Sequence, residues 1–166
     1  MKLITQNEGM QGYKETKIGW IPEEWEATQL KECINSKGKY GINAPSVDYA
    51  SELFTYLRIT DIDDSGKFIN ETKKSVNHPD SEDFILNEGD IVFARTGATV
   101  GKTYLYDEKD GELVYAGFLI NFSPNLKILN PKYLKLFTET EQYWRFVTVV
   151  SMRSGQPGIN ENEYAN

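Results

Sequence analysis

The stretch of residues 87–106 constrains the fold most, because it reads as a turn, a strand, a glycine-bearing loop and a second strand. The glycine and acids of 88–90 predict the turn, and the apolar run Ile91–Ala94 predicts the first strand. The small polar residues 95–99 predict the loop, and the β-branched and aromatic residues of 100–106 predict the second strand. The rest of the chain is interpreted around this strand pair.

The loop between these strands also carries a distinct chemistry. It and the start of the next strand supply two cations, two hydroxyls and two glycines: Arg95, Lys102, Thr96, Thr99, Gly97 and Gly101. No acidic residue occurs from Ile91 to Tyr106, although the chain has a net charge of −7. Backbone N–H groups, hydroxyls and fixed cations favour an anionic oxygen, most plausibly a phosphate. The alternative is a hairpin loop whose glycines only permit the turn.

The spacing of the loop argues against a nucleotide-binding P-loop. That motif needs four residues between its first glycine and Gly-Lys-Ser/Thr. Here three residues separate Gly97 from Gly101, and the residues after Lys102 and Thr103 predict a strand. A P-loop without its helix lacks the N–H groups and the dipole that bind phosphates.

Length and composition predict one globular domain. The chain has 166 residues, of which 26% are charged and 13% aromatic, and residues 1–12 are polar enough to predict a flexible lead-in. We therefore expect a single domain over 13–166. The single cysteine, Cys33, excludes an internal disulfide framework and favours a cytoplasmic location. No apolar run has the length of a membrane span, so no membrane partner is expected.

The negative net charge argues against a simple nucleic-acid-binding protein, which usually has an excess of Lys and Arg. The acids are unevenly placed, however, and many crowd one region: Asp61, Asp63, Asp64, Asp80, Glu82, Asp83, Glu88 and Asp90. A cationic face can coexist with an acidic remainder, which would discourage non-specific phosphate binding. The acidic surface could instead face a protein partner.

Other segments predict further strands and an extended arm. Residues 13–25 hold Trp20 and Trp25 beside a proline, which predicts an extended arm clamped by aromatic burial. Residues 53–63 predict a strand carrying one cation, Arg58. Residues 113–123 predict a strand pair or a bent strand.

Helical character is confined to the C-terminal third. Asn130 and Pro131 form a good helix start, as N-cap and first helical residue. Apolar residues then recur at helical spacing to Val150, with a possible break near Thr140. We expect this helix to cover one face of the sheet with a core stripe. The predicted fold class is mixed α/β (α+β), with a mainly antiparallel twisted sheet and a C-terminal helical segment.

Two metal-binding patterns fail on inspection. Residues 61–66 resemble the start of a calcium loop, but its twelfth position is Thr72 rather than glutamate, so the aspartates predict a turn. Asp80, Asp107 and Lys109 formally match a nuclease pattern. Because 107–111 predicts a hydrophilic turn rather than a rigid strand, we interpret the match as chance. No metal and no cofactor are expected.

Four stretches in order carry a family resemblance: YKETKIGWIPEEW at 13–25, YLRITDI at 56–62, GDIVFARTGATVGKTYLY at 89–106 and SGQPGIN at 154–160. Together they resemble the target recognition domain of the specificity subunit of type I restriction–modification enzymes. The resemblance implies a mixed α/β domain akin to the small DNA-recognition domain of certain adenine methyltransferases. In that family a full subunit carries two such domains, and each reads one half of a split DNA target.

The resemblance also implies a role and partners. We expect a non-catalytic module that binds double-stranded DNA. In that family long spacer helices hold the methyltransferase subunits, and we expect them to be missing here. Methyltransferase and translocase/nuclease subunits would therefore join only if these helices were supplied. The sequence contains no Asn- or Asp-Pro-Pro-aromatic motif and no glycine signature for S-adenosylmethionine.

The candidate DNA-binding residues fall into two groups. Arg95, Thr96, Gly97, Thr99 and Lys102 are predicted to contact phosphates, which position the protein without reading sequence. Base reading is assigned to cationic and amide side chains on adaptable loops: Arg58, Lys37, Lys39, Tyr40, Arg153 and Gln156.

Two other functions stay open. One is a protein-binding orphan regulator of a restriction complex. The other is an enzyme, either a metal nuclease using Asp80, Asp107 and Lys109 or a phosphate-transfer domain using Lys102.

Overall fold

The computed structural model describes residues 11–153 and 157–166. Its strands are β1 (Tyr13–Thr16), β2 (Gly19–Pro22), β3 (Lys39–Tyr40), β4 (Ser46–Val47), β5 (Phe54–Leu57), β6 (Lys74–Val76), β7 (Ile91–Ala94), β8 (Thr103–Leu105), β9 (Leu113–Tyr115) and β10 (Leu119–Phe122). Its α-helices are α1 (Pro131–Phe137), α2 (Glu141–Ser151) and α3 (Glu161–Ala165). Short 3-10 helices at Ile59–Asp61, Gly97–Thr99 and Glu108–Asp110 are among the connections.

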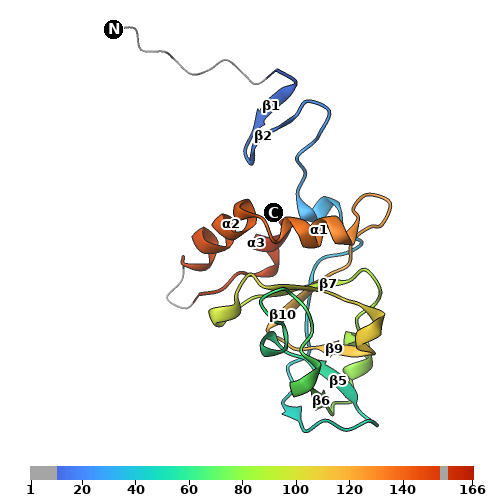
Figure 1. Cartoon of the computed structure of the whole chain (residues 1–166). Helices are drawn as coiled ribbons and strands as arrows, with labels where there is room; N and C mark the ends of the chain where they lie inside the picture. Colours follow the sequence, from blue (N-terminus) through green and yellow to red (C-terminus); the bar gives the residue numbers. More distant parts are fainter. Residues whose placement is uncertain (1–10, 154–156) are drawn as a thin grey trace.

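The strands of the body form two four-stranded sheets under a helical layer. The first sheet has the order β3-β10-β7-β8 and the second the order β4-β6-β5-β9. Every strand pair is antiparallel except β5 with β9. Figure 1 shows the three helices over the first sheet, with β5, β6 and β9 on its other side. The predicted fold class, a mainly antiparallel mixed α/β domain with C-terminal helices, is confirmed.

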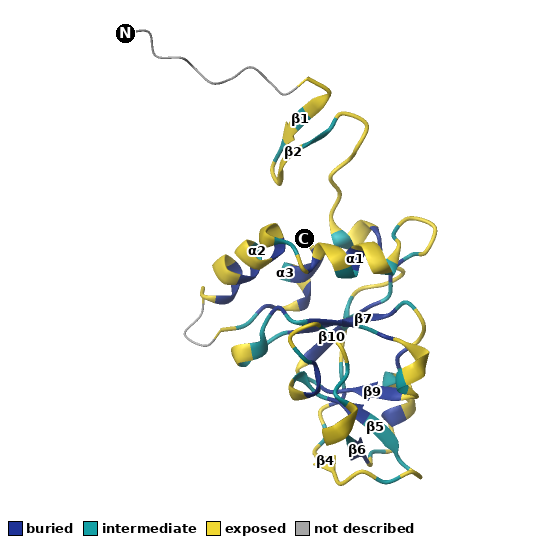
Figure 2. Ribbon diagram, in the orientation of Figure 1, coloured by how far each residue is buried: buried dark blue, intermediate teal, exposed yellow. Residues whose placement is uncertain are grey.

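The first sheet is buried on both faces, because one face meets the helices and the other meets the second sheet (Figure 2). All four residues of β7 are buried. Phe93 and Ile120 pack under Val147 of α2 on the helical side. Their strand neighbours Val92 and Leu119 belong to the cluster on the opposite side. An apolar run without alternation is what a strand buried on both faces requires.

The helical segment breaks where the sequence predicted. The Asn130 side chain accepts a hydrogen bond from the Lys132 backbone N–H at the start of α1. The Thr140 side chain caps α2 by accepting from the Tyr143 N–H. The predicted core stripe is only partly buried, since Leu134 and Val147 lie in the core while others on the stripe, such as Tyr133, are exposed. Two short helices share the stripe, so its phase is not continuous.

Two predicted strands are shorter than expected. In 53–63 only Phe54–Leu57 is strand, because the Asp61 carboxylate accepts from the Arg58 backbone N–H and winds Ile59–Asp61 into a 3-10 helix. In 100–106 only Thr103–Leu105 is strand. Residues 113–123, predicted as a strand pair or a bent strand, form two strands, but β9 and β10 belong to different sheets and do not pair with each other.

The N-terminal arm differs from the prediction. Residues 13–22 form a hairpin in which β1 pairs only with β2 among the described strands, and Figure 1 shows it apart from the layered body. Trp20 and Trp25 are 44% and 54% exposed. The predicted clamp by aromatic burial is therefore wrong, because the paired strands bring these rings to no buried surface.

No helix in residues 11–153 and 157–166 is both long and apolar enough to cross a membrane.

Candidate nucleic-acid interface

The loop after β7 is held at its first residue by two other segments. The Arg95 backbone N–H donates to the carbonyl of Phe118 (3.0 Å), and its carbonyl accepts from the Ile159 N–H (2.9 Å). Thr96 forms an isolated antiparallel bridge with Gly158. The end of β7, the β9–β10 turn and the segment before α3 therefore meet at one point.

The Arg95 side chain lies across the end of the first sheet. Its guanidinium carbon is 4.8 Å from the centre of the Tyr40 ring, a cation–π distance. The Tyr40 hydroxyl in turn accepts from the Glu161 backbone N–H (3.1 Å), which fixes the ring. The Arg95 Nε is buried, and among the described residues it has no hydrogen-bond partner. The arginine is thus oriented by stacking, and no carboxylate of the described chain pairs with it.

Arg95 lines a pocket of about 260 Å³, which we call the arginine pocket. Its other lining residues are Thr96, Val150, Arg153, Gly158, Ile159, Asn160 and Glu163. The Glu163 carboxylate is engaged by the Asn160 backbone N–H (2.9 Å) in a capping box. Two arginines therefore face one carboxylate that is already hydrogen-bonded, so the pocket has a net positive charge.

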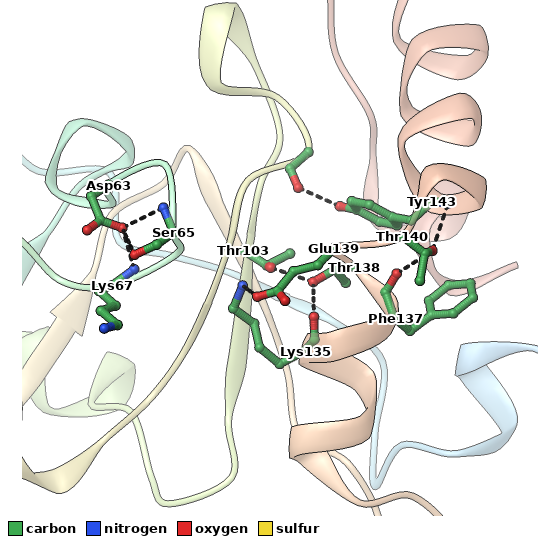
Figure 3. Close-up of polar contacts among 11 residues, drawn as sticks. Asp63, Ser65, Lys67, Thr103, Lys135, Phe137, Thr138, Glu139, Thr140 and Tyr143 are labelled. Carbon is green, nitrogen blue, oxygen red and sulfur yellow. Dashed lines mark hydrogen bonds and ion pairs between the residues drawn. The ribbon is translucent and has the colours of Figure 1, made fainter.

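Lys102 lies in a different pocket, of about 330 Å³, which we call the lysine pocket. Its Nζ is 2.6 Å from a carboxylate oxygen of Asp64. Lys135, which also lines this pocket, pairs with Glu139 at 2.9 Å (Figure 3). With Asp63 the pocket has three carboxylates against two lysines. The structure therefore does not bring Lys102 and Arg95 together, and the phosphate contact predicted for Lys102 stays a prediction.

The turn that links the two pockets is helical rather than open. Gly97–Thr99 forms one 3-10 turn, begun by Gly97 with a φ of 73°. A side chain at Gly97 would meet nothing within 4 Å, so its role is conformational. The Thr99 Oγ1 is buried and has no hydrogen-bond partner among the described residues.

The residues predicted to read bases are dispersed. Arg153 lines the arginine pocket, and Lys37 is exposed in the segment before β3. Lys39 points elsewhere: its Nζ contacts the Asp83 carbonyl and lies 4.3 Å from the Phe84 ring centre. Gln156 lies outside the described residues.

Arg58 is engaged within its own turn. Its Nε and Nη2 donate to the two carboxylate oxygens of Asp61, at 2.7 and 2.6 Å, and the Asp61 side chain is 1% exposed. A base could compete for this guanidinium only by leaving Asp61 buried and unpaired, which is costly. Base reading by Arg58 stays a prediction that this geometry does not favour.

Two tyrosines that sequence reasoning assigned no role hold the loop in place. The Tyr164 hydroxyl donates to the Ala94 carbonyl (2.8 Å) and accepts from the Gly101 N–H (3.1 Å). The Tyr143 hydroxyl donates to the Gly101 carbonyl (2.7 Å). Burial raises the pKa of both hydroxyls above the ordinary 10.0. The helical spacing of Tyr143 indicated burial, but nothing local indicated this contact with a residue 42 positions away.

The aspartate patterns form turns. The Asp63 carboxylate accepts from the backbone N–H groups of Ser65 and Lys67 (Figure 3), which confirms the predicted turn. Asp107 accepts from the Lys109 N–H in the turn that contains Glu108–Asp110. In the part of the chain that the structure describes, no group of three His, Cys, Asp or Glu side chains is placed to hold a metal.

Comparison with known proteins adds a family and a fold. A family model described as "Type I restriction modification DNA specificity domain" matches residues 22–163. The putative type I restriction enzyme MjaX specificity subunit of Methanocaldococcus jannaschii is 28% identical over 173 residues. That alignment covers 98% of this chain and 39% of the relative, so the chain spans well under half of the relative's length.

Two solved structures share the fold. One belongs to a study of the complex assembly and conformational transition of the type I R-M system, with a TM-score of 0.65 and 18% identity over 87% of this chain and 37% of that one. The other is the crystal structure of the HsdS subunit from Thermoanaerobacter tengcongensis, with a TM-score of 0.62 and 18% identity over 88% of this chain and 37% of that one.

Proposed function

Since the chain belongs to the family of type I restriction modification DNA specificity domains, we propose that residues 13–166 bind double-stranded DNA and read one half of a bipartite target. The domain does not catalyse a reaction. It determines the position on the DNA at which other subunits act. Methyltransferase and restriction subunits are the proposed partners.

The arginine pocket is the observation that carries this proposal. It presents two guanidinium groups, and Arg95 is preoriented by Tyr40 without a carboxylate partner in the described chain. Guanidinium groups donate in a planar fork that matches phosphate oxygens and the acceptor edge of guanine. In a chain of net charge −7, a local positive site restricts binding to one face and limits non-specific affinity.

A domain exchange tests the function. The chain replaces one recognition domain in a complete type I specificity subunit, joined to its spacer helices, and methylated adenines are mapped by sequencing. We expect the hybrid target to keep one half of the host's sequence and to exchange the other. An active hybrid that keeps both host halves would contradict half-site recognition. An Arg95→Ala hybrid is the matched control, and it should methylate poorly at every site.

A binding measurement tests the DNA contact separately. The isolated chain should bind duplex DNA weakly and with strong dependence on salt, because counterion release at a few phosphate contacts supplies most of the affinity and half a target adds little more. Titration of labelled duplex at two salt concentrations checks this. Affinity that does not change with salt would argue against phosphate contacts.

A further inference from the structure

One aromatic side chain next to Arg95 has no role in the contacts described so far. Phe118 occupies the turn between β9 and β10, closed by a hydrogen bond from the Leu119 N–H to the Ala116 carbonyl (2.8 Å). Its side chain is 57% exposed, whereas the next strand residues, Leu119 and Ile120, are fully buried.

The strand register places Phe118 beside Arg95. Leu119 pairs with Ala94 across β10 and β7, so Phe118 and Arg95 are the next opposed positions. The hydrogen bond from the Arg95 N–H to the Phe118 carbonyl confirms that the backbones stay adjacent there.

Tyr40 lies near the same end of the first sheet. It is paired with Ile120 across β3 and β10, two positions along the chain from Phe118. The backbone of Phe118 therefore lies beside Arg95, whose guanidinium stacks on Tyr40, at one end of the first sheet. An oriented cation and an exposed ring thus come from adjacent positions.

The turn that carries Phe118 is fixed on both sides. The Gly117 N–H donates to the Ile42 carbonyl (2.8 Å), and the Gly41 N–H donates to the Leu119 carbonyl (3.0 Å). Gly41 has no room for a side chain, because an added Cβ would lie 2.4 Å or less from carbonyl oxygens of Tyr115 and Ala116. An exposed ring on a fixed turn loses little conformational entropy when it makes a contact.

We propose that Phe118 inserts as a wedge between two stacked bases of the DNA, next to the phosphate that Arg95 contacts. This inference rests on the proposed function. A phenyl ring offers neither a donor to a phosphate nor a partner to a base edge, so its use against DNA is stacking between bases, which kinks the duplex. Pyrimidine–purine steps unstack most easily, and the half-site therefore contains such a step beside the Arg95 phosphate.

The experiment starts from a duplex enriched by the purified chain from a randomised 20-base-pair pool. 2-Aminopurine replaces each purine of the enriched sequence in turn, and its fluorescence rises where stacking is lost. We expect one step to brighten on binding. Phe118→Ala should abolish that signal and weaken binding about tenfold, with the salt dependence unchanged because no phosphate contact is lost. Phe118→Leu should retain part of both effects.

The controls separate two kinds of failure. Tyr133→Ala removes a similarly exposed ring from α1 and should leave the affinity and the fluorescence unchanged. If the chain binds with normal salt dependence, yet no position brightens and Phe118→Ala binds like the wild type, the wedge is overturned while the proposed function stands. If no sequence is enriched and binding does not depend on salt, the proposed function fails with it.

Discussion

The arginine pocket and the lysine pocket lie at the two ends of the same β7–β8 loop, and each contains two basic side chains. In the lysine pocket both cations are paired with carboxylates, at 2.6 Å for Lys102 and 2.9 Å for Lys135. In the arginine pocket Arg95 stacks on an aromatic ring instead. Both ends of the loop look alike in the sequence, but only one offers positive charge that the described chain does not neutralise.

The comparison shows that a basic residue in the sequence does not by itself indicate a nucleic-acid contact. The groups that pair with its charge in the fold must also be known. The carboxylate of Asp64 is 99% exposed, so its pair with Lys102 is a surface pair that contributes little and that salt weakens. The Asp64 carboxylate nevertheless offsets part of the Lys102 charge that an approaching phosphate would meet. Arg95 keeps its field because a π face orients a cation without cancelling its charge.

Arg95→Ala is the change with the largest expected effect on DNA binding. Loss of a charge-assisted contact should weaken binding to all sequences by about 2 kcal/mol, roughly thirtyfold. The slope of log affinity against log salt should fall by about one. Titration at several salt concentrations measures both. Arg95→Lys is the control and should keep the slope while losing part of the affinity. An intact Arg95→Ala protein with unchanged binding would remove the difference between the pockets.

Tyr164→Phe should have an intermediate effect, on stability. It deletes the hydroxyl that holds Ala94 and Gly101, the residues that precede Arg95 and Lys102, and should lower the free energy of unfolding by about 1–2 kcal/mol. Denaturant unfolding at neutral pH measures this, with the exposed Tyr133→Phe as control. A loss no larger than that of the control would show that the loop is fixed by packing alone.

Tyr164 and Tyr143 also predict how stability depends on pH. Their folded-state pKa is raised above the ordinary 10.0, so the stabilisation they provide is fully present below pH 10. It is lost as pH rises further, because the unfolded tyrosines release protons that the folded ones retain. The decline approaches about 1.4 kcal/mol per pH unit for each such tyrosine. Thermal unfolding between pH 8 and pH 11 in the wild type and Tyr164→Phe would reveal a shallower decline in the variant.

The smallest expected effect concerns Lys102 and Asp64. Lys102→Ala should change DNA affinity by less than about threefold, because a neighbouring carboxylate already offsets its charge. Asp64→Asn should raise affinity slightly at low salt and have no effect at high salt, since screening removes the interaction. A loss for Lys102→Ala as large as that for Arg95→Ala would mean that DNA displaces Asp64, and that both ends of the loop contact phosphate.

Local signals in the sequence predicted much of the fold. Four consecutive apolar residues between a glycine turn and a polar loop sufficed for β7, and Asn130 with Pro131 sufficed for the start of α1. Such features depend on neighbours within a few residues, whose hydrogen bonds are local. The ordered motifs also predicted the family, since several weak matches in the right order make a specific one.

The site depended on contacts across the chain. The sequence alone nominated Arg95, but Tyr40 reaches it through the β3–β10–β7 register, and Arg153 joins it only where the end of α2 and the segment before α3 line one pocket. It also nominated Arg58 and Lys102, whose charges the fold pairs with Asp61 and Asp64. The sequence shows where charges occur, but their neutralisation depends on distances of a few ångströms that only the fold sets, to a near neighbour for Arg58 and to a residue 38 positions away for Lys102. The sequence therefore determined which side chains could bind an anion, and only the tertiary structure decided which of them keeps its charge available.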